Sequence, residues 1–95
     1  PAAKGKFKRI ELRSPDPMAN PYIAYALLIY AGLDGIESRL ALPEPTNLNL
    51  YTASSEVTDK LDRLPETLTE AIDEACRSSF VAEVLPDGFA QLLKI

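Results

Sequence analysis

The sequence predicts part of an α+β domain that is mostly α-helical, with one N-terminal β-strand at about residues 7–13 that belongs to a larger sheet. Three observations favour this class: an alternating stretch at residues 7–13, an apolar helix at residues 21–31, and a capped amphipathic helix from residue 67. A chain of 95 residues buries only about 60–65% of the surface that its unfolded form exposes. It cannot enclose an apolar helix by itself, so we expect residues 1–95 to form a single partial domain.

The first element is predicted to be a strand because charged and apolar side chains alternate in it. The apolar residues Ile10 and Leu12 are flanked on each side by charged ones, which are Arg9, Glu11 and Arg13. A period of two residues is typical of a strand. The Ser-Pro-Asp-Pro sequence that follows ends the strand, since proline lacks the amide donor of a sheet ladder.

The next element is a helix that begins at Asn20 and Pro21. An Asn side chain can accept from a free amide of the first turn, and proline suits the first helical position. Residues 22–31 are all apolar or Tyr, so this helix has no solvated face and is expected to be buried nearly all round. These residues are far fewer than the roughly 20 that cross a bilayer, and Gly32 and Gly35 weaken the helix end.

Two further helices are predicted after an irregular connector. Residues 46–63 are polar and indicate an exposed loop or a short fraying helix. The sequence Thr-Leu-Thr-Glu at residues 67–70 has the form of a capping box, and the helix that it opens carries one apolar stripe, formed by Leu68, Ala71, Ile72, Ala75 and Cys76. A short helix restarts at Ser78 or Ser79 and runs through Leu85, and a last amphipathic turn is marked by Phe89, Leu92 and Leu93.

Composition excludes several kinds of site within this chain. Histidine is absent and Cys76 is the single cysteine, which excludes a Ser-His or Cys-His nucleophile pair, a histidine-ligated metal and an internal disulfide. Residues 1–13 hold five of the ten basic residues and one of the fourteen acidic ones, a net charge of +4, and residues 14–95 carry a net charge of −8. Most of the surface should therefore repel nucleic acid, and an anion site belongs near the start.

The strand pattern places Arg9, Glu11 and Arg13 on one face, about 6.6–6.8 Å apart in steps of two residues. Two interpretations of this row are open. It is either a solvated strand face, or a phosphate and metal site in which Glu11 offers an oxygen ligand to Mg²⁺ or Mn²⁺ and the arginines hold anionic oxygens. A single carboxylate does not make a metal site, so further ligands would have to come from elsewhere.

A run of motifs in order resembles the late part of the catalytic domain of bacterial-type (type I) glutamine synthetase. The similarity covers nearly all of residues 8–93. Its motifs are Arg-Ile-Glu-Leu-Arg-Ser-Pro-Asp-Pro at residues 9–17, Ala-Asn-Pro-Tyr at 19–22, Ala-Gly-Leu-Asp-Gly-Ile at 31–36, Asn-Leu-Tyr at 49–51 and Leu-Pro-Glu-Thr-Leu-Thr-Glu-Ala at 64–71.

The resemblance implies a role for each charged residue of the first motif. Glu11 corresponds to a ligand of a divalent metal, Mg²⁺ or Mn²⁺, beside the nucleotide phosphates. Arg9 corresponds to the arginine that contacts the phosphates of ATP, the co-substrate. Arg13 corresponds to the catalytic and substrate-binding arginine that meets glutamate and its transferred phosphoryl group.

The resemblance also implies the reaction and the partners of the parent protein. Such enzymes phosphorylate the γ-carboxylate of glutamate with ATP and let ammonia displace the phosphate, and they act in the cytoplasm as homododecamers. No nucleic acid and no membrane partner is expected. The first residue, Pro1, suggests a cut within a longer protein, and Ile95 lies short of the segment by which such subunits bind across two stacked rings. The fragment alone is expected to be inactive.

Three weaker candidates remain. Tyr51 lies in an Asn-Leu-Tyr triplet where adenylylated members of the family carry the modified tyrosine, but the residues after it do not match their pattern, so modification is the less favoured interpretation. Cys76 is expected to be a structural thiol on the apolar stripe of its helix. The tyrosines of the apolar helix, which are Tyr22, Tyr25 and Tyr30, are expected to be core residues.

Two alternatives to a glutamine synthetase stay open. One is a ligase of the same superfamily that joins glutamate to a polyamine or another amine, although the Ser-Pro-Asp-Pro turn is more like the ammonia-using branch. The other belongs to a different class, a helical interaction module without catalysis that would bind a partner through the apolar helix 21–31. A non-catalytic paralogue is less attractive because Arg9, Glu11 and Arg13 are all present.

Overall fold

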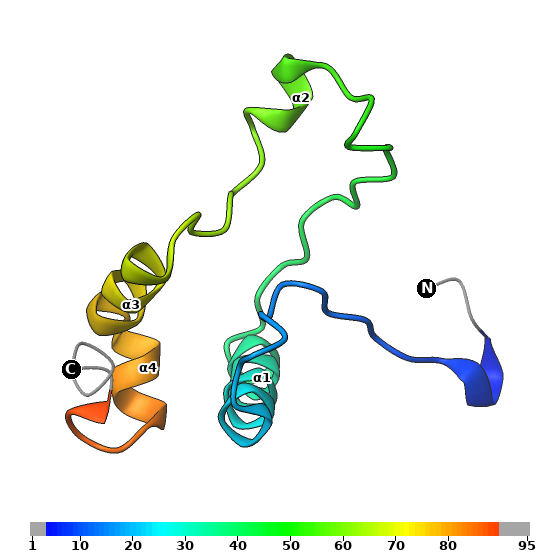
Figure 1. The fold of residues 1–95 in the computed structure, drawn as a ribbon. Helices are drawn as coiled ribbons and strands as arrows, with labels where there is room; N and C mark the ends of the chain where they lie inside the picture. The colour runs from blue at the N-terminus through cyan, green and yellow to red at the C-terminus, as the bar shows by residue number, and fades with distance from the viewer. Residues whose placement is uncertain (1–3, 90–95) are drawn as a thin grey trace.

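The computed structural model describes residues 4–89 of the chain, and about half of these residues are helical. The elements are a 3₁₀ helix η1 (Gly5–Phe7) and the α-helices α1 (Pro21–Glu37), α2 (Ser55–Thr58), α3 (Leu68–Arg77) and α4 (Ser79–Val84). Figure 1 shows an extended segment before α1, a long loop that carries α2 away from the other helices, and α3 followed directly by α4. The helical part of the predicted fold class is confirmed.

The strand predicted at about residues 7–13 does not form in the described part of the chain. Gly5–Phe7 forms η1 instead, in which the amide of Lys8 donates to the carbonyl of Gly5 at 3.1 Å. Residues 8–14 follow without regular secondary structure. A strand requires ladder hydrogen bonds to a neighbour, and no described segment pairs with residues 8–14. The alternating pattern therefore coincides with an extended segment (Figure 1), but the predicted strand is wrong for the described residues because no partner strand is present among them.

Helix α1 begins where the sequence predicted. The Asn20 side chain accepts hydrogen bonds from the amides of Tyr22, at 3.0 Å, and Ile23, at 3.3 Å, and Pro21 is the first helical residue. The helix continues through both glycines to Glu37, so the predicted weak end lies one turn later. There Arg39 adopts φ +50° and the Leu40 amide donates to the Gly35 carbonyl at 3.0 Å, which is the left-handed termination that usually carries glycine.

The expectation that α1 is buried nearly all round is not met within the described residues. None of its residues is buried, and Tyr22 and Ile36 are 86% and 74% exposed. Tyr25 and Tyr30 are also exposed, so the tyrosines predicted to be core residues are on the surface here. Burial needs facing elements on several sides, and α1 contacts one other described helix, α4. Among the described helices, none combines the length and apolar character that a bilayer crossing needs.

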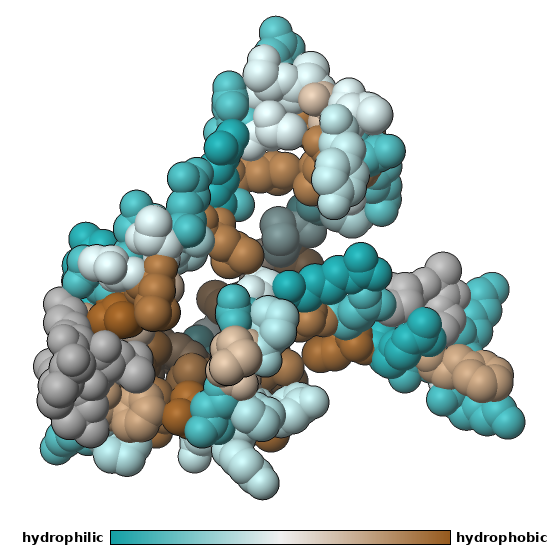
Figure 2. Space-filling view, viewed as in Figure 1, coloured by the Kyte–Doolittle hydropathy of each residue, from teal (hydrophilic) through white to brown (hydrophobic). Residues whose placement is uncertain are grey.

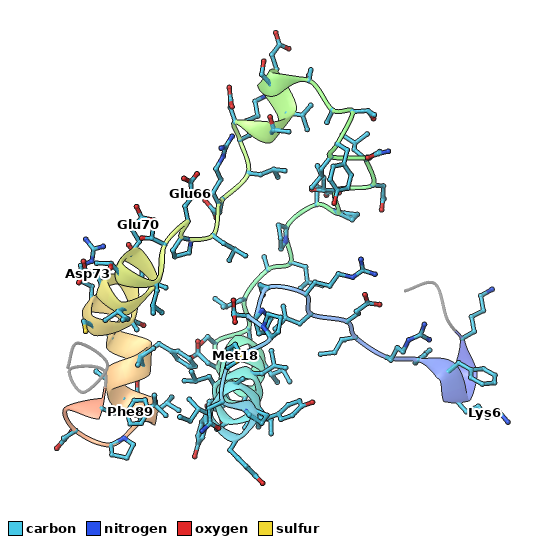
Figure 3. All side chains as sticks on the ribbon, in the orientation of Figure 1. Lys6, Met18, Glu66, Glu70, Asp73 and Phe89 are labelled. Atoms are coloured by element: carbon cyan, nitrogen blue, oxygen red, sulfur yellow. The ribbon has the colours of Figure 1, made fainter. Side chains whose placement is uncertain are left out.

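The capping box of α3 is confirmed. The Thr67 hydroxyl accepts from the Glu70 amide at 3.2 Å, and Glu70 Oε2 accepts from the amides of Thr67, at 3.2 Å, and Glu66, at 2.9 Å. Glu66 and Glu70 accordingly lie together at the start of this helix in Figure 3. Ser78 then caps α4 by accepting from the Val81 amide at 3.2 Å. Both short helices therefore start on side chains that satisfy free amides of their first turn.

Packing between the helices is sparse. Helix α4 contacts both α1 and α3, and the part of the predicted apolar stripe that is half-buried consists of Ala71, Ile72, Ala75 and Cys76. The radius of gyration is 15.9 Å, against about 13 Å for a compact domain of 100 residues. Figure 2 shows apolar side chains lining the open centre of the molecule. Of the final turn predicted at Phe89, Leu92 and Leu93, only Phe89 lies within the described residues, and it is half-buried.

We predict that Thr67→Ala weakens the start of α3 in the full-length protein. Loss of a Thr N-cap costs about 0.5–2 kcal/mol, so the free energy of local opening at the first-turn amides should fall by about 1 kcal/mol. Native-state hydrogen exchange measures this quantity. Thr69→Ala is the matched control, because Thr69 lies in the same turn and makes no cap contact. Equal exchange rates in both variants would contradict the role of the cap.

Candidate functional site

The row of Arg9, Glu11 and Arg13 lies on the extended segment between η1 and α1. All three residues are exposed, and Lys6 marks the far end of this segment in Figure 3. The alternation of the sequence predicted one shared face. The structure brings Glu11 and Arg13 into contact, as expected for residues two apart on an extended backbone, and it does not bring Arg9 to Glu11.

Glu11 and Arg13 form an ion pair in which Arg13 Nε donates to Glu11 Oε1. The Glu11 side chain is 46% exposed and the Arg13 side chain 87% exposed. A pair this open to solvent contributes at most about 1 kcal/mol to folding. Its importance is geometric, because it uses one nitrogen of the guanidinium and leaves the two terminal nitrogens without a partner among the described residues.

Arg9 has a different environment. Its Nη1 donates to the main-chain carbonyl of Phe7 at 3.3 Å, and the Phe7 ring also lies 5.3 Å from Lys6 Nζ. The two arginines are therefore not equivalent, although each is two residues from Glu11. One is held by a neutral carbonyl and the other by a carboxylate, a difference that the sequence pattern did not indicate.

A turn at Asp16 fixes how the charged segment leaves towards α1. Asp16 Oδ1 accepts from the Met18 amide at 2.8 Å, and the Asp16 carbonyl accepts from the Ala19 amide at 2.9 Å. Pro17 occupies the second position of this turn, where its fixed φ is favourable. The prolines predicted this break, but nothing in the sequence pattern predicted the hydrogen bonds of Asp16 that shape the turn.

The turn lies beside the start of α3, which the sequence analysis did not predict. Ser14, Asp16, Met18 and Ala19 form one side of a groove whose other side is formed by residues 64–68 and Ala71. These two stretches are about 50 residues apart in the chain. No pattern in the sequence predicted that these two stretches would face each other. The groove connects the charged segment to the capped helix.

The donor set for a divalent metal is incomplete in the described residues. No group of three or more Asp, Glu or Cys side chains there is placed to hold a metal ion. Glu11 fits the role of one ligand, since its carboxylate is accessible and its Oε2 has no partner among residues 4–89. A hard oxygen donor of this kind suits Mg²⁺ or Mn²⁺, but a metal site here would need further ligands from outside residues 4–89.

Tyr51 is fully exposed at the tip of a tight turn. Asn49 Oδ1 accepts from the Tyr51 amide at 3.0 Å, and the Asn49 carbonyl accepts from the Thr52 amide at 3.1 Å. The relative exposure of Tyr51 is 101%, so none of the described residues covers its phenol. Accessibility does not distinguish a modified tyrosine from an unmodified one, and modification remains a prediction.

Comparison with known proteins gives a family-model match and several similar curated proteins. The family model described as "Glutamine synthetase, catalytic domain" matches residues 1–92. The chain is 47% identical over 87 residues to the glutamine synthetase of Methanosarcina mazei, which covers 90% of this chain and 20% of that protein. It is 46% identical over 76 residues to that of Methanocaldococcus jannaschii, covering 78% and 17%, and 40% identical over 87 residues to that of Thermotoga maritima, covering 90% and 20%.

The chain thus spans about a fifth of the length of the curated relatives that it matches. No solved structure matches it significantly. The match covers the charged segment, the Asp16 turn, α1 and the capped helix α3 within one family model.

Proposed function

The chain belongs to the glutamine synthetase catalytic-domain family, and on this premise we propose that its parent protein ligates ammonia to glutamate at the expense of ATP. The observation that carries the proposal is the family match across residues 1–92, which includes the Arg9, Glu11 and Arg13 row. We propose further that residues 1–95 are a late segment of the catalytic domain.

The proposed reaction has two steps, phosphorylation of glutamate and displacement of phosphate by ammonia. An oxygen of the glutamate γ-carboxylate attacks the γ-phosphorus of ATP, ADP leaves, and an acyl phosphate forms. Ammonia then attacks the acyl carbon, the bond to the phosphate oxygen breaks, and glutamine and phosphate are released after loss of a proton. Both steps need the reacting groups held in line and the charge of the moving phosphoryl group neutralised.

In the proposed reaction, Arg9, Glu11 and Arg13 divide these two tasks. Arg9 binds phosphate oxygens of ATP, and Arg13 binds glutamate and the phosphoryl group that it receives, because guanidinium donors match carboxylate and phosphate oxygens. Glu11 supplies one oxygen to a divalent cation, which when bound would neutralise charge on the phosphates. All three side chains are exposed on their segment, which gives substrates access to them.

The remaining machinery belongs to other parts of the parent. Further metal ligands and the ammonia and nucleotide-base pockets would come from there, so residues 1–95 alone are expected to be inactive. The exposed apolar side chains of α1, such as Tyr22 and Ile36, would be covered there too. In line with the family resemblance, we expect a cytoplasmic homododecamer that binds neither nucleic acid nor membrane.

The reaction is tested by ATP-dependent phosphate release from the full-length protein, supplied with Mg²⁺ and glutamate and with either ammonium or a polyamine as acceptor. Release that needs ammonium supports the proposal. Release only with the polyamine would assign the protein to the amine ligases of the same superfamily. Release with neither acceptor would contradict a ligase and favour a helical interaction module.

Glu11→Ala is expected to lower turnover of the full-length enzyme at least about a hundredfold, because one metal ligand and its charge compensation are lost. Steady-state kinetics at saturating Mg²⁺ measure this effect. Glu44→Ala is the matched control, since Glu44 is an exposed carboxylate on the loop after α1. Near-normal activity of Glu11→Ala would be incompatible with the metal role.

Arg9→Ala and Arg13→Ala are expected to separate the two substrates. Loss of Arg9 should mainly raise the KM for ATP, and loss of Arg13 mainly the KM for glutamate, each by about tenfold or more, as expected when a charged hydrogen bond to a substrate is removed. Arg63→Ala, which removes an exposed arginine remote in sequence, is the control. If the two effects were exchanged, the roles of Arg9 and Arg13 would be exchanged as well.

A further inference from the structure

The contact between Glu11 and Arg13 has a specific geometry. Glu11 Oε1 accepts a hydrogen bond from Nε of Arg13, the guanidinium nitrogen that is bonded to the aliphatic part of the side chain. The two terminal nitrogens of Arg13 have no partner within the described residues, and the side chain is 87% exposed. A guanidinium held through Nε still presents its outer pair of donors in the fork geometry that binds two oxygens of one anion.

The anchoring matters because an exposed arginine is otherwise disordered over many rotamers. Ordering a long side chain costs conformational entropy when it binds a ligand. A hydrogen bond at Nε restricts the torsions of the stem before the anion arrives, so less freedom is lost on binding. Arg9 lacks such an anchor, since its contact is a terminal nitrogen on the carbonyl of Phe7.

We propose that Glu11 is the positioning residue of Arg13: its carboxylate holds Nε so that the two terminal nitrogens of Arg13 are presented to a phosphate or carboxylate group. This inference rests on the proposed function for the identity of the anion and deepens it. Glu11 then has two tasks, with Oε1 directed to Arg13 and Oε2 available to a divalent cation. The cation and the anion are coupled through one side chain.

Two effects of Glu11 on anion binding have opposite signs, which makes the inference testable. Its negative charge repels an anion, so removing the charge should strengthen anion binding. Its hydrogen bond to Arg13 favours binding, so removing the bond should weaken it. Glu11→Gln removes the charge and keeps an amide oxygen that can accept from Nε. Glu11→Ala removes both, and the two variants carry the same net charge.

The experiment measures the affinity of the full-length protein for inorganic phosphate, by titration calorimetry, after a chelator has removed divalent cations. Glu11→Gln should bind phosphate at least as tightly as the unsubstituted protein. Glu11→Ala should bind about three- to tenfold more weakly than Glu11→Gln, as expected for the net contribution of one exposed hydrogen bond. This difference should vanish in an Arg13→Ala background and persist in an Arg9→Ala background.

Equal affinities of Glu11→Gln and Glu11→Ala would overturn the inference, as would a difference that survives in Arg13→Ala or an unsubstituted protein that binds no phosphate. The test is independent of turnover. A Gln to Ala difference in a protein without ammonium-dependent phosphate release would support the positioning role and contradict the proposed reaction. Ammonium-dependent turnover without a difference between Glu11→Gln and Glu11→Ala in phosphate affinity would support the proposed reaction and contradict the positioning role.

Discussion

Hydrogen bonds at the ends of helices stabilise most of the regular structure described here, because none of residues 4–89 is buried. Asn20, Thr67 with Glu70, and Ser78 each satisfy amides that the first turn leaves free. Without a core, helices as short as α3 and α4 gain little from tertiary packing. The starts of α1, α3 and α4 along the chain therefore follow the positions of these capping side chains.

Because none of residues 4–89 is buried, the helices also expose much apolar surface. Helix α1 carries apolar residues on all sides and contacts one described helix. Its exposed side chains, such as Tyr25 and Ile29, would be costly to leave in water in a finished domain. This agrees with two findings: the chain spans about a fifth of the length of the curated relatives, and its residues 1–92 match a catalytic-domain family model.

The candidate site also lacks packing partners among the described residues. Its charged segment lacks a neighbouring strand among the described residues, so its geometry comes from local contacts: Glu11 with Arg13, Arg9 with Phe7, and the turn at Asp16. These contacts give the two arginines different environments. Such a division would suit the phosphoryl transfer that we propose for the parent protein, because the donor and the acceptor of the phosphoryl group must be held separately and in line.

The sequence by itself determined the features that depend on neighbouring residues. The cap of α1 at Asn20, the capping box at Thr67, the restart at Ser78 and the alternation of Arg9, Glu11 and Arg13 were all predictable, because each depends on side chains within four residues. Only the tertiary structure decided that residues 8–14 find no strand partner among the described residues, that α1 is exposed there, and that the Asp16 turn lines a groove together with the start of α3. Pairing and burial depend on what lies opposite a residue in space, and a local pattern does not specify that neighbour.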